Sequence, residues 1–359
     1  MTRKVWFQVA IGLLLTLFII KYFMEIKWIL SPIMIVLQTI FYPLLIAGVL
    51  FYITVPAQIY LEKIKFPRWA SIGTIFVFIS AIIWLATSLV GPPIIQQINN
   101  LIENAPQIIN ESTVLVIDLL EKAGSLPKWL NDAIDSVTDT LTELPAEFGR
   151  WTVTFIQSVF SGALVIVLTP FFLIFMLKDH EKLVPFVTQF FSGDRKAWVK
   201  RTLKDIDDVL NLYIRGQVLI STILATLLYI GYSIIGLNFA LLLVVFAFFM
   251  NIIPFIGPWI AYFPALIIAL FQDPIMAIWV SIITLVAQQT DANLITPNIM
   301  GKTLNIHPLT IITILLAAGN IAGVIGILLA VPGYAVGKAV ISNIYKERKR
   351  IKEAATRTI

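Results

Sequence analysis

The sequence predicts an all-α membrane protein with about eight transmembrane helices, some of them short and broken. Hydrophobic residues make up 58% of the 359 positions and charged residues only 13%, whereas roughly a quarter of a soluble domain is charged. The apolar residues also form long runs without Asp, Glu, Lys or Arg, and about 20 such residues suffice to cross a bilayer. These runs cover residues 28–61, 69–102, 151–177, 216–272 and 303–337.

The composition argues against an enzyme and against a bound cofactor. The chain has no cysteine, which excludes a disulfide framework, a thiolate metal site and a cysteine nucleophile. The run Gly301-Lys302-Thr303 suggests a phosphate-binding loop, but that motif needs a glycine where Thr296 stands. We therefore expect no metal, no cofactor and no use of ATP.

Positive residues in short loops predict the orientation of the first three helices. Arg3 and Lys4 place the N-terminus in the cytoplasm, and the basic connection at residues 62–68 is also expected there. We predict transmembrane helices at about 5–23, 29–55 and 69–91. The last of these should stop at Gly91-Pro92-Pro93. Residues 1–91 thus form the N-terminal membrane region.

Residues 92–150 interrupt the membrane pattern. They carry nine acidic and three basic side chains, and their short apolar stripes recur at helical spacing. We interpret the region as a set of amphipathic helices on the extracytoplasmic side of the membrane.

The membrane-spanning part resumes over residues 151–340. A fourth helix is expected at about 151–177 and a charged cytoplasmic segment at 178–215. Four further helices follow. They are expected at about 216–236, 239–253, 258–272 and 275–295.

The final apolar run, residues 309–337, contains glycines that can break a helix near its middle. Gly319, Gly323 and Gly326 favour a re-entrant hairpin, although a ninth full span remains an alternative. Beyond it, residues 341–359 form a basic tail, which we assign to the cytoplasm and to contact with anionic lipid rather than nucleic acid.

Asp291 is the acidic residue that points most directly to an ion or solute path. Ionisable groups at membrane depth are costly and tend to mark such paths. The residue belongs to a polar cluster that ends an apolar helix, and a helix end that reaches the lipid headgroups would explain it equally well. Gln288 shares a helix face with Asp291, and Gln289 shares one with Asn293.

Two other polar residues have competing interpretations. His307 can exchange protons near neutral pH, but a histidine before Pro308 more often caps or packs a helix. Arg215 stands where a helix enters the membrane. It can attract a solute or simply anchor the helix on the cytoplasmic side.

The order of several short motifs resembles the autoinducer-2 exporter (AI-2E) family of bacterial membrane transporters. The motifs are Tyr213-Ile214-Arg215-Gly216-Gln217, Asn251-Ile252-Ile253-Pro254-Phe255-Ile256-Gly257-Pro258, Asn293-Leu294-Ile295-Thr296-Pro297 with Gly301, His307 and Pro308, and Gly319, Gly323 and Gly326 with Pro332. The resemblance implies about eight membrane helices and export of a furanone signal, and it adds Gln217 and Asn251 to the candidate path. Some relatives are credited with Na⁺(Li⁺)/H⁺ antiport, and many carry Glu where this chain has Asp291.

Independently of the resemblance, helices interrupted by Pro and Gly are typical of transporter substrate sites. We therefore expect a bacterial plasma-membrane exporter of a small polar solute, with both termini cytoplasmic. The alternatives are a cation/proton antiporter that moves H⁺ or Na⁺, and a membrane scaffold that binds a partner through residues 92–150. We also expect a homo-oligomer.

Overall fold

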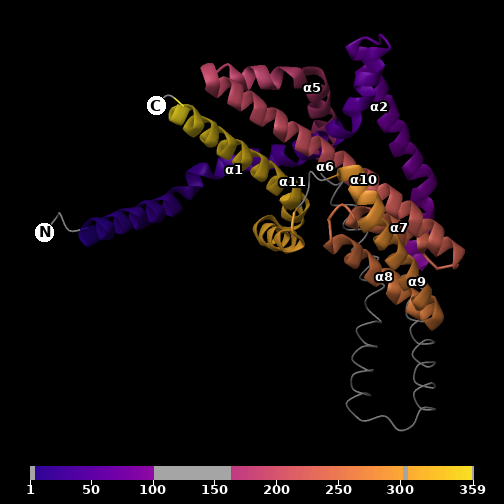
Figure 1. Cartoon of the computed structure of the whole chain (residues 1–359). Helices are drawn as coiled ribbons and strands as arrows, with labels where there is room; N and C mark the ends of the chain where they lie inside the picture. Colours follow the sequence, from indigo (N-terminus) through magenta and orange to yellow (C-terminus); the bar gives the residue numbers. More distant parts are fainter. Residues whose placement is uncertain (1–4, 101–162, 302–305, 358–359) are drawn as a thin grey trace, which may run out of the picture.

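The computed structural model describes residues 5–100, 163–301 and 306–357, and within them all regular secondary structure is helical (Figure 1). Five of the described helical stretches are long and apolar enough to cross a membrane. They are Ser31–Lys63, Arg68–Asn100, Gly193–Ile234, Pro274–Met300 and Ile325–Arg350. The predicted all-α membrane class is thus confirmed. Most of the predicted outer region, 92–150, falls outside the described residues.

The N-terminal helix differs from the prediction. One continuous helix, α1 (Val5–Lys63), runs through both expected spans, so the reversal predicted near residues 24–28 is absent. No glycine interrupts residues 13–47. The three prolines of α1 remove single hydrogen bonds and bend a helix, but they do not reverse it.

The next helix also continues past its predicted end. It consists of α2 (Arg68–Leu85), the π-helical turn η1 (Ala86–Val90) and further helix to residue 100. The predicted stop at Gly91-Pro92-Pro93 was therefore wrong. The Gly91 N–H bonds to the Ala86 carbonyl, five residues back, and such a π-turn accommodates prolines that lack N–H groups.

The next two helices connect α1 and α2 to the C-terminal helices. Helix α5 (Ala163–Thr188) packs on α1 and α2 through a small buried cluster that includes Phe51, Ile72 and Leu173. After a short turn, α6 (Gly193–Ile234) combines a charged first half with an apolar second half in one helix of 42 residues. The helices that follow pack on α6, except for the second of them, which packs on its two neighbours in the sequence.

The helices that follow α6 are short, as predicted. They are α7 (Ala240–Met250), α8 (Ile256–Gln272) and α9 (Pro274–Thr290), which continues through the π-helical turn η2 (Asp291–Ile295) into α10 (Thr296–Met300). With 11 residues, α7 is only about 16 Å long. It is therefore too short to cross a hydrocarbon core of about 30 Å.

The last helix, α11 (Pro308–Arg357), is broken where the glycines predicted a break. Ala322 and Gly323 leave helical geometry, and Gly323 has a φ of 59°, which favours glycine. A Cβ on Gly326 would lie 1.9 Å from the Ala318 carbonyl oxygen. The two parts of α11 therefore approach each other closely, as in a hairpin.

Polar contacts gather the basic segments on one side of the molecule, which we call the basic side. Arg68 lies 3.1 Å from Glu181 in α5, and Arg201 in α6 lies 3.2 Å from Glu347 in α11. Figure 1 shows the last part of α11 running beside the first half of α6, in agreement with their contacts.

Candidate functional site

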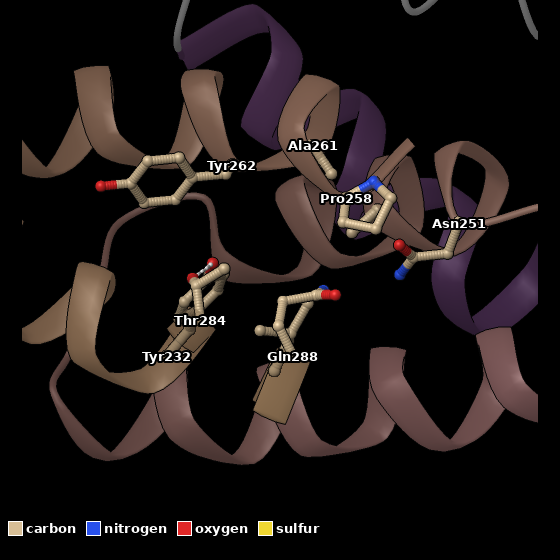
Figure 2. A pocket seen from close by; sticks show the side chains of 9 residues that line it. Tyr232, Asn251, Pro258, Ala261, Tyr262, Thr284 and Gln288 are labelled. Atoms are coloured by element: carbon tan, nitrogen blue, oxygen red, sulfur yellow. Dashed lines mark hydrogen bonds between the residues drawn. The ribbon is translucent and has the colours of Figure 1, made fainter. Parts of the chain in front are cut away.

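A small cavity lies among α6, α7, α8 and α9, and we call it the chamber. Its volume is about 10 Å³, which is close to the room needed for one water molecule. It is lined by Leu228, Tyr232, Ala247, Asn251, Pro258, Ala261, Tyr262, Thr284 and Gln288 (Figure 2). All four helices contribute, so the chamber depends on the packing of the whole C-terminal bundle.

Paired hydroxyl groups hold one end of the chamber. The hydroxyls of Tyr232 in α6 and Thr284 in α9 are 2.8 Å apart, and those of Tyr262 in α8 and Ser281 in α9 are 2.7 Å apart. Ser281, Thr284 and Gln288 recur at helical spacing, so one face of α9 is polar although most of its surroundings are apolar. This arrangement places hydrogen-bonding groups inside an apolar bundle.

Asn251 brings a buried side-chain amide to the chamber without a partner among the described residues. Asn251 is 3% exposed, and neither its Oδ1 nor its Nδ2 has a hydrogen-bond partner among the described residues. In Figure 2 this amide and that of Gln288 turn toward one another. Leaving such a buried group unpaired costs about 1–3 kcal/mol. A site that keeps it has hydrogen-bonding capacity available for a bound molecule.

Gln217 fixes the backbone at Asn251. Its Nε2 donates a hydrogen bond of 2.6 Å to the Asn251 carbonyl oxygen, and both residues are buried. Gln217 does not line the chamber itself. It lies in α6 and orients Asn251 through this hydrogen bond.

The turn between α7 and α8 explains why Asn251 reaches the chamber. Asn251 ends α7, and Pro254 and Phe255 turn the chain within a few residues. Phe255 has a φ of 66°, a conformation that non-glycine residues seldom adopt. Such strained backbone persists only where the surrounding packing enforces it.

Asp291 lies close to the chamber in sequence but does not line it. It begins the π-helical turn η2, and its Oδ1 accepts a hydrogen bond of 2.7 Å from the Thr296 hydroxyl. Turns of this kind are frequent at functional sites. The carboxylate is half-buried and holds the joint between α9 and α10.

Arg215 also lies outside the chamber lining. Its Nε donates to the backbone carbonyl of Tyr52 in α1, and the Tyr52 hydroxyl donates to Asp207 at 2.9 Å. The guanidinium therefore joins α6 to α1.

Three other predicted residues lie on the surface. The Asn293 amide donates to the Gln289 side chain at 3.1 Å, and both residues are exposed. Exposed His307 caps α11, because its Nδ1 accepts from the Leu309 N–H at 3.3 Å. The predicted face of Gln289 and Asn293 exists, but it points away from the chamber.

The predicted helix breaks have distinct roles. Pro258 lines the chamber and Gly257 packs against Met250. Pro297 lies in the first turn of α10, Gly301 ends that helix with a φ of 58°, and Pro308 opens α11. Pro332 instead lies buried within α11 and does not end that helix.

Sequence reasoning missed Tyr232, Tyr262 and Thr284. Each is a neutral residue within an apolar helix, so none stands out by charge. A usable signal was the four-residue spacing of Thr284 and Gln288 on α9. Among the described residues, no group of three or more His, Cys, Asp and Glu side chains is placed to hold a metal ion.

The sequence is similar to those of known transport proteins. A family model described as AI-2E family transporter matches residues 10–346. YueF and YrrI of Bacillus subtilis (strain 168), both named as transport proteins, are 34% and 32% identical to this chain, and each alignment covers 96% of both proteins. PerM of Escherichia coli (strain K12), named as a permease, is 30% identical over 83% of this chain and 86% of its own length. The chain therefore belongs to the AI-2E family of multi-pass membrane transport proteins.

Proposed function

We propose that the protein carries a small, uncharged polar solute across the membrane through the chamber. The observation behind this proposal is the buried Asn251 amide, which faces Gln288 across the chamber and lacks a partner among the described residues. An amide offers both donors and an acceptor, so it can bind hydroxyl or carbonyl groups of a solute.

The lining favours an uncharged solute. Tyr232, Tyr262, Thr284 and Gln288 supply hydroxyl and amide groups, and no charged side chain is among the lining residues. A charged solute in such a site would leave water without gaining an opposite charge, which is costly.

Passage of a metabolite through the chamber requires the chamber to widen. A cavity of about 10 Å³ holds about one water molecule, so a metabolite enters only when the helices around the chamber separate. Conversion between conformations open to either side is the usual behaviour of transporters whose sites lie between broken helices.

For the solute and direction we propose outward movement of autoinducer-2, as the resemblance of the sequence motifs to the AI-2E family implies. Cation/proton antiport is the second candidate, and it rests on Asp291 alone. Because Asp291 bonds Thr296 and does not line the chamber, we favour the solute exporter.

The test uses two neighbouring glutamines on α9 as a matched pair. Efflux of labelled autoinducer-2 is measured in proteoliposomes containing the protein, the Gln288→Leu variant or the Gln289→Leu variant. Gln288 lines the chamber, whereas exposed Gln289 does not. We expect Gln288→Leu to lower efflux at least tenfold and Gln289→Leu to leave it within about twofold, since a good hydrogen bond contributes about 1.5 kcal/mol.

Asn251→Leu provides a second variant from another helix and should reduce efflux similarly. Equal efflux from the unaltered protein and from empty liposomes would refute the assignment of this solute. Unchanged efflux in both Gln288→Leu and Asn251→Leu would refute the chamber as the path.

A further inference from the structure

Helix α6 packs antiparallel to the continuous helix formed by α9, η2 and α10. The two helices make a close contact toward each end. At one end Tyr232 bonds Thr284, and a Cβ on Gly231 would lie 2.4 Å from Ile283 Cγ2. At the other end a Cβ on Gly216 would lie 3.1 Å from Met300 Cγ and 3.2 Å from Met300 Cε. Glycine thus permits the closest approach of these helices at both ends.

The chamber lies at the Tyr232–Thr284 end of this helix pair, and the Gly216–Met300 contact lies toward the other end. Leu228 and Gln288, which both line it, are each about 18 Å along their helices from the Gly216–Met300 contact. That contact lies beside Arg215, where the charged first half of α6 ends, and therefore toward the basic side. Met300 is 7% exposed, so its side chain fills the space between α10 and α6.

Helix α10 has a joint at each end. The π-helical turn η2 precedes it, with the hydrogen bond between Asp291 and Thr296 across the turn. Gly301 follows it with φ 58° and ψ −150°, a backbone conformation that suits glycine. A five-residue helix between two such joints can move without disturbing the longer α9.

From this arrangement we infer that Met300, seated on Gly216, is the gate that closes the chamber toward the basic side. Opening moves α10 away from α6 and unseats the thioether, while the Gly231–Ile283 contact stays closed. Methionine suits this position because its flexible, unbranched side chain fills a gap and releases it easily. The inference rests on the proposed transport function, since it assigns a gate to that same chamber.

The first experiment locks the gate, and it is straightforward because the chain has no cysteine. A Gly216→Cys, Met300→Cys double variant places two Cβ atoms near the separation of about 3.5–4.5 Å that a disulfide requires. Oxidation should reduce solute efflux at least tenfold, and reduction should restore it. Each single variant serves as a control and should not respond to oxidant. Undiminished efflux from fully cross-linked protein would overturn the inference.

The second experiment does not depend on transport. A Gln288→Cys reporter is labelled with a membrane-impermeant thiol reagent from the basic side, alone and together with Met300→Ala. We expect Met300→Ala to raise the labelling rate at least fivefold. Ile283→Ala, at the opposite contact, is the matched control and should not raise it.

The two readouts separate the possible failures. If the unaltered protein moves no solute but Met300→Ala still exposes the reporter, the proposed solute is wrong and the gate stands. If transport occurs and neither cross-linking nor Met300→Ala has an effect, the gate is wrong. Met300→Leu, which keeps the side-chain size, should label like the unaltered reporter protein. Faster labelling in Met300→Leu would indicate general loosening of the fold and would also count against the gate.

Discussion

The carbonyl oxygen of Met250 occupies the place that a Cβ at position 257 would need. A Cβ built on Gly257 lies 1.9 Å from this oxygen and 2.6 Å from the carbonyl carbon, far inside any normal contact. The end of α7 and the start of α8 are therefore in backbone contact. This contact holds the turn from which the Asn251 amide enters the chamber.

Gly257→Ala should consequently displace the α7–α8 turn, since backbone atoms cannot rotate away as a side chain can. We expect a loss of about 1–3 kcal/mol of stability together with a strong loss of efflux. The measurement is thermal unfolding of the detergent-solubilised protein beside the efflux assay. The control is Gly73→Ala in α2, where a Cβ meets no described atom within 4 Å, and an equal loss there would contradict the explanation.

The contacts of the basic side yield a prediction about topology. Ser192, Tyr345 and residues 62–68 should all face the cytoplasm, because the polar contacts of α5, α6 and α11 place them on one side and short basic loops favour the cytoplasm. Asn238, in the exposed turn between α6 and α7, should face outward.

Single cysteines at these positions can be labelled without background in a chain that lacks cysteine. In intact cells an impermeant thiol reagent should modify Asn238→Cys, and only cell lysis should allow it to modify Ser192→Cys and Tyr345→Cys. Labelling of Tyr345→Cys in intact cells would instead support a full crossing of the membrane by α11 and an outward basic tail.

The helix breaks of the C-terminal half could be predicted from the sequence because they depend on local chemistry. Gly323 adopts a positive φ, and Pro308 begins α11, where a missing N–H has no cost. The predicted helix end at Gly91 was wrong because a single π-helical turn accommodates the two prolines that follow. Nothing in the sequence marks such a turn.

The chamber itself could be predicted only in part. Asn251 and Gln288 were identified from motif and spacing, whereas Tyr232 and Thr284 emerge from the register between α6 and α9. That register depends on close approach at Gly216 and Gly231, which are distant from their contacts in sequence. The partner of Arg215 could not be predicted either, because the Tyr52 carbonyl of α1 is distant from Arg215 along the chain.

Asp291 provides the prediction that separates solute export from cation/proton antiport. Its Oδ1 accepts a hydrogen bond from Thr296 across η2, and an asparagine amide oxygen can accept the same bond. Asp291→Asn should therefore preserve the joint between α9 and α10 and keep solute efflux within about twofold of the unaltered protein. Asp291→Leu removes the acceptor and should lower efflux by roughly tenfold, as expected for about 1.4 kcal/mol.

Antiport gives the opposite expectation for the same variant, since a coupling carboxylate must alternate between protonated and ion-bound forms. Proton movement driven by Na⁺ or Li⁺ gradients is measured in proteoliposomes with a pH-sensitive dye. If the protein is an antiporter coupled through Asp291, the unaltered protein shows this movement and Asp291→Asn abolishes it. Efflux that survives in Asp291→Asn and fails in Asp291→Leu would assign the carboxylate to holding α10 in place. That outcome would also link Asp291 to the Met300 gate, because both act on the same short helix.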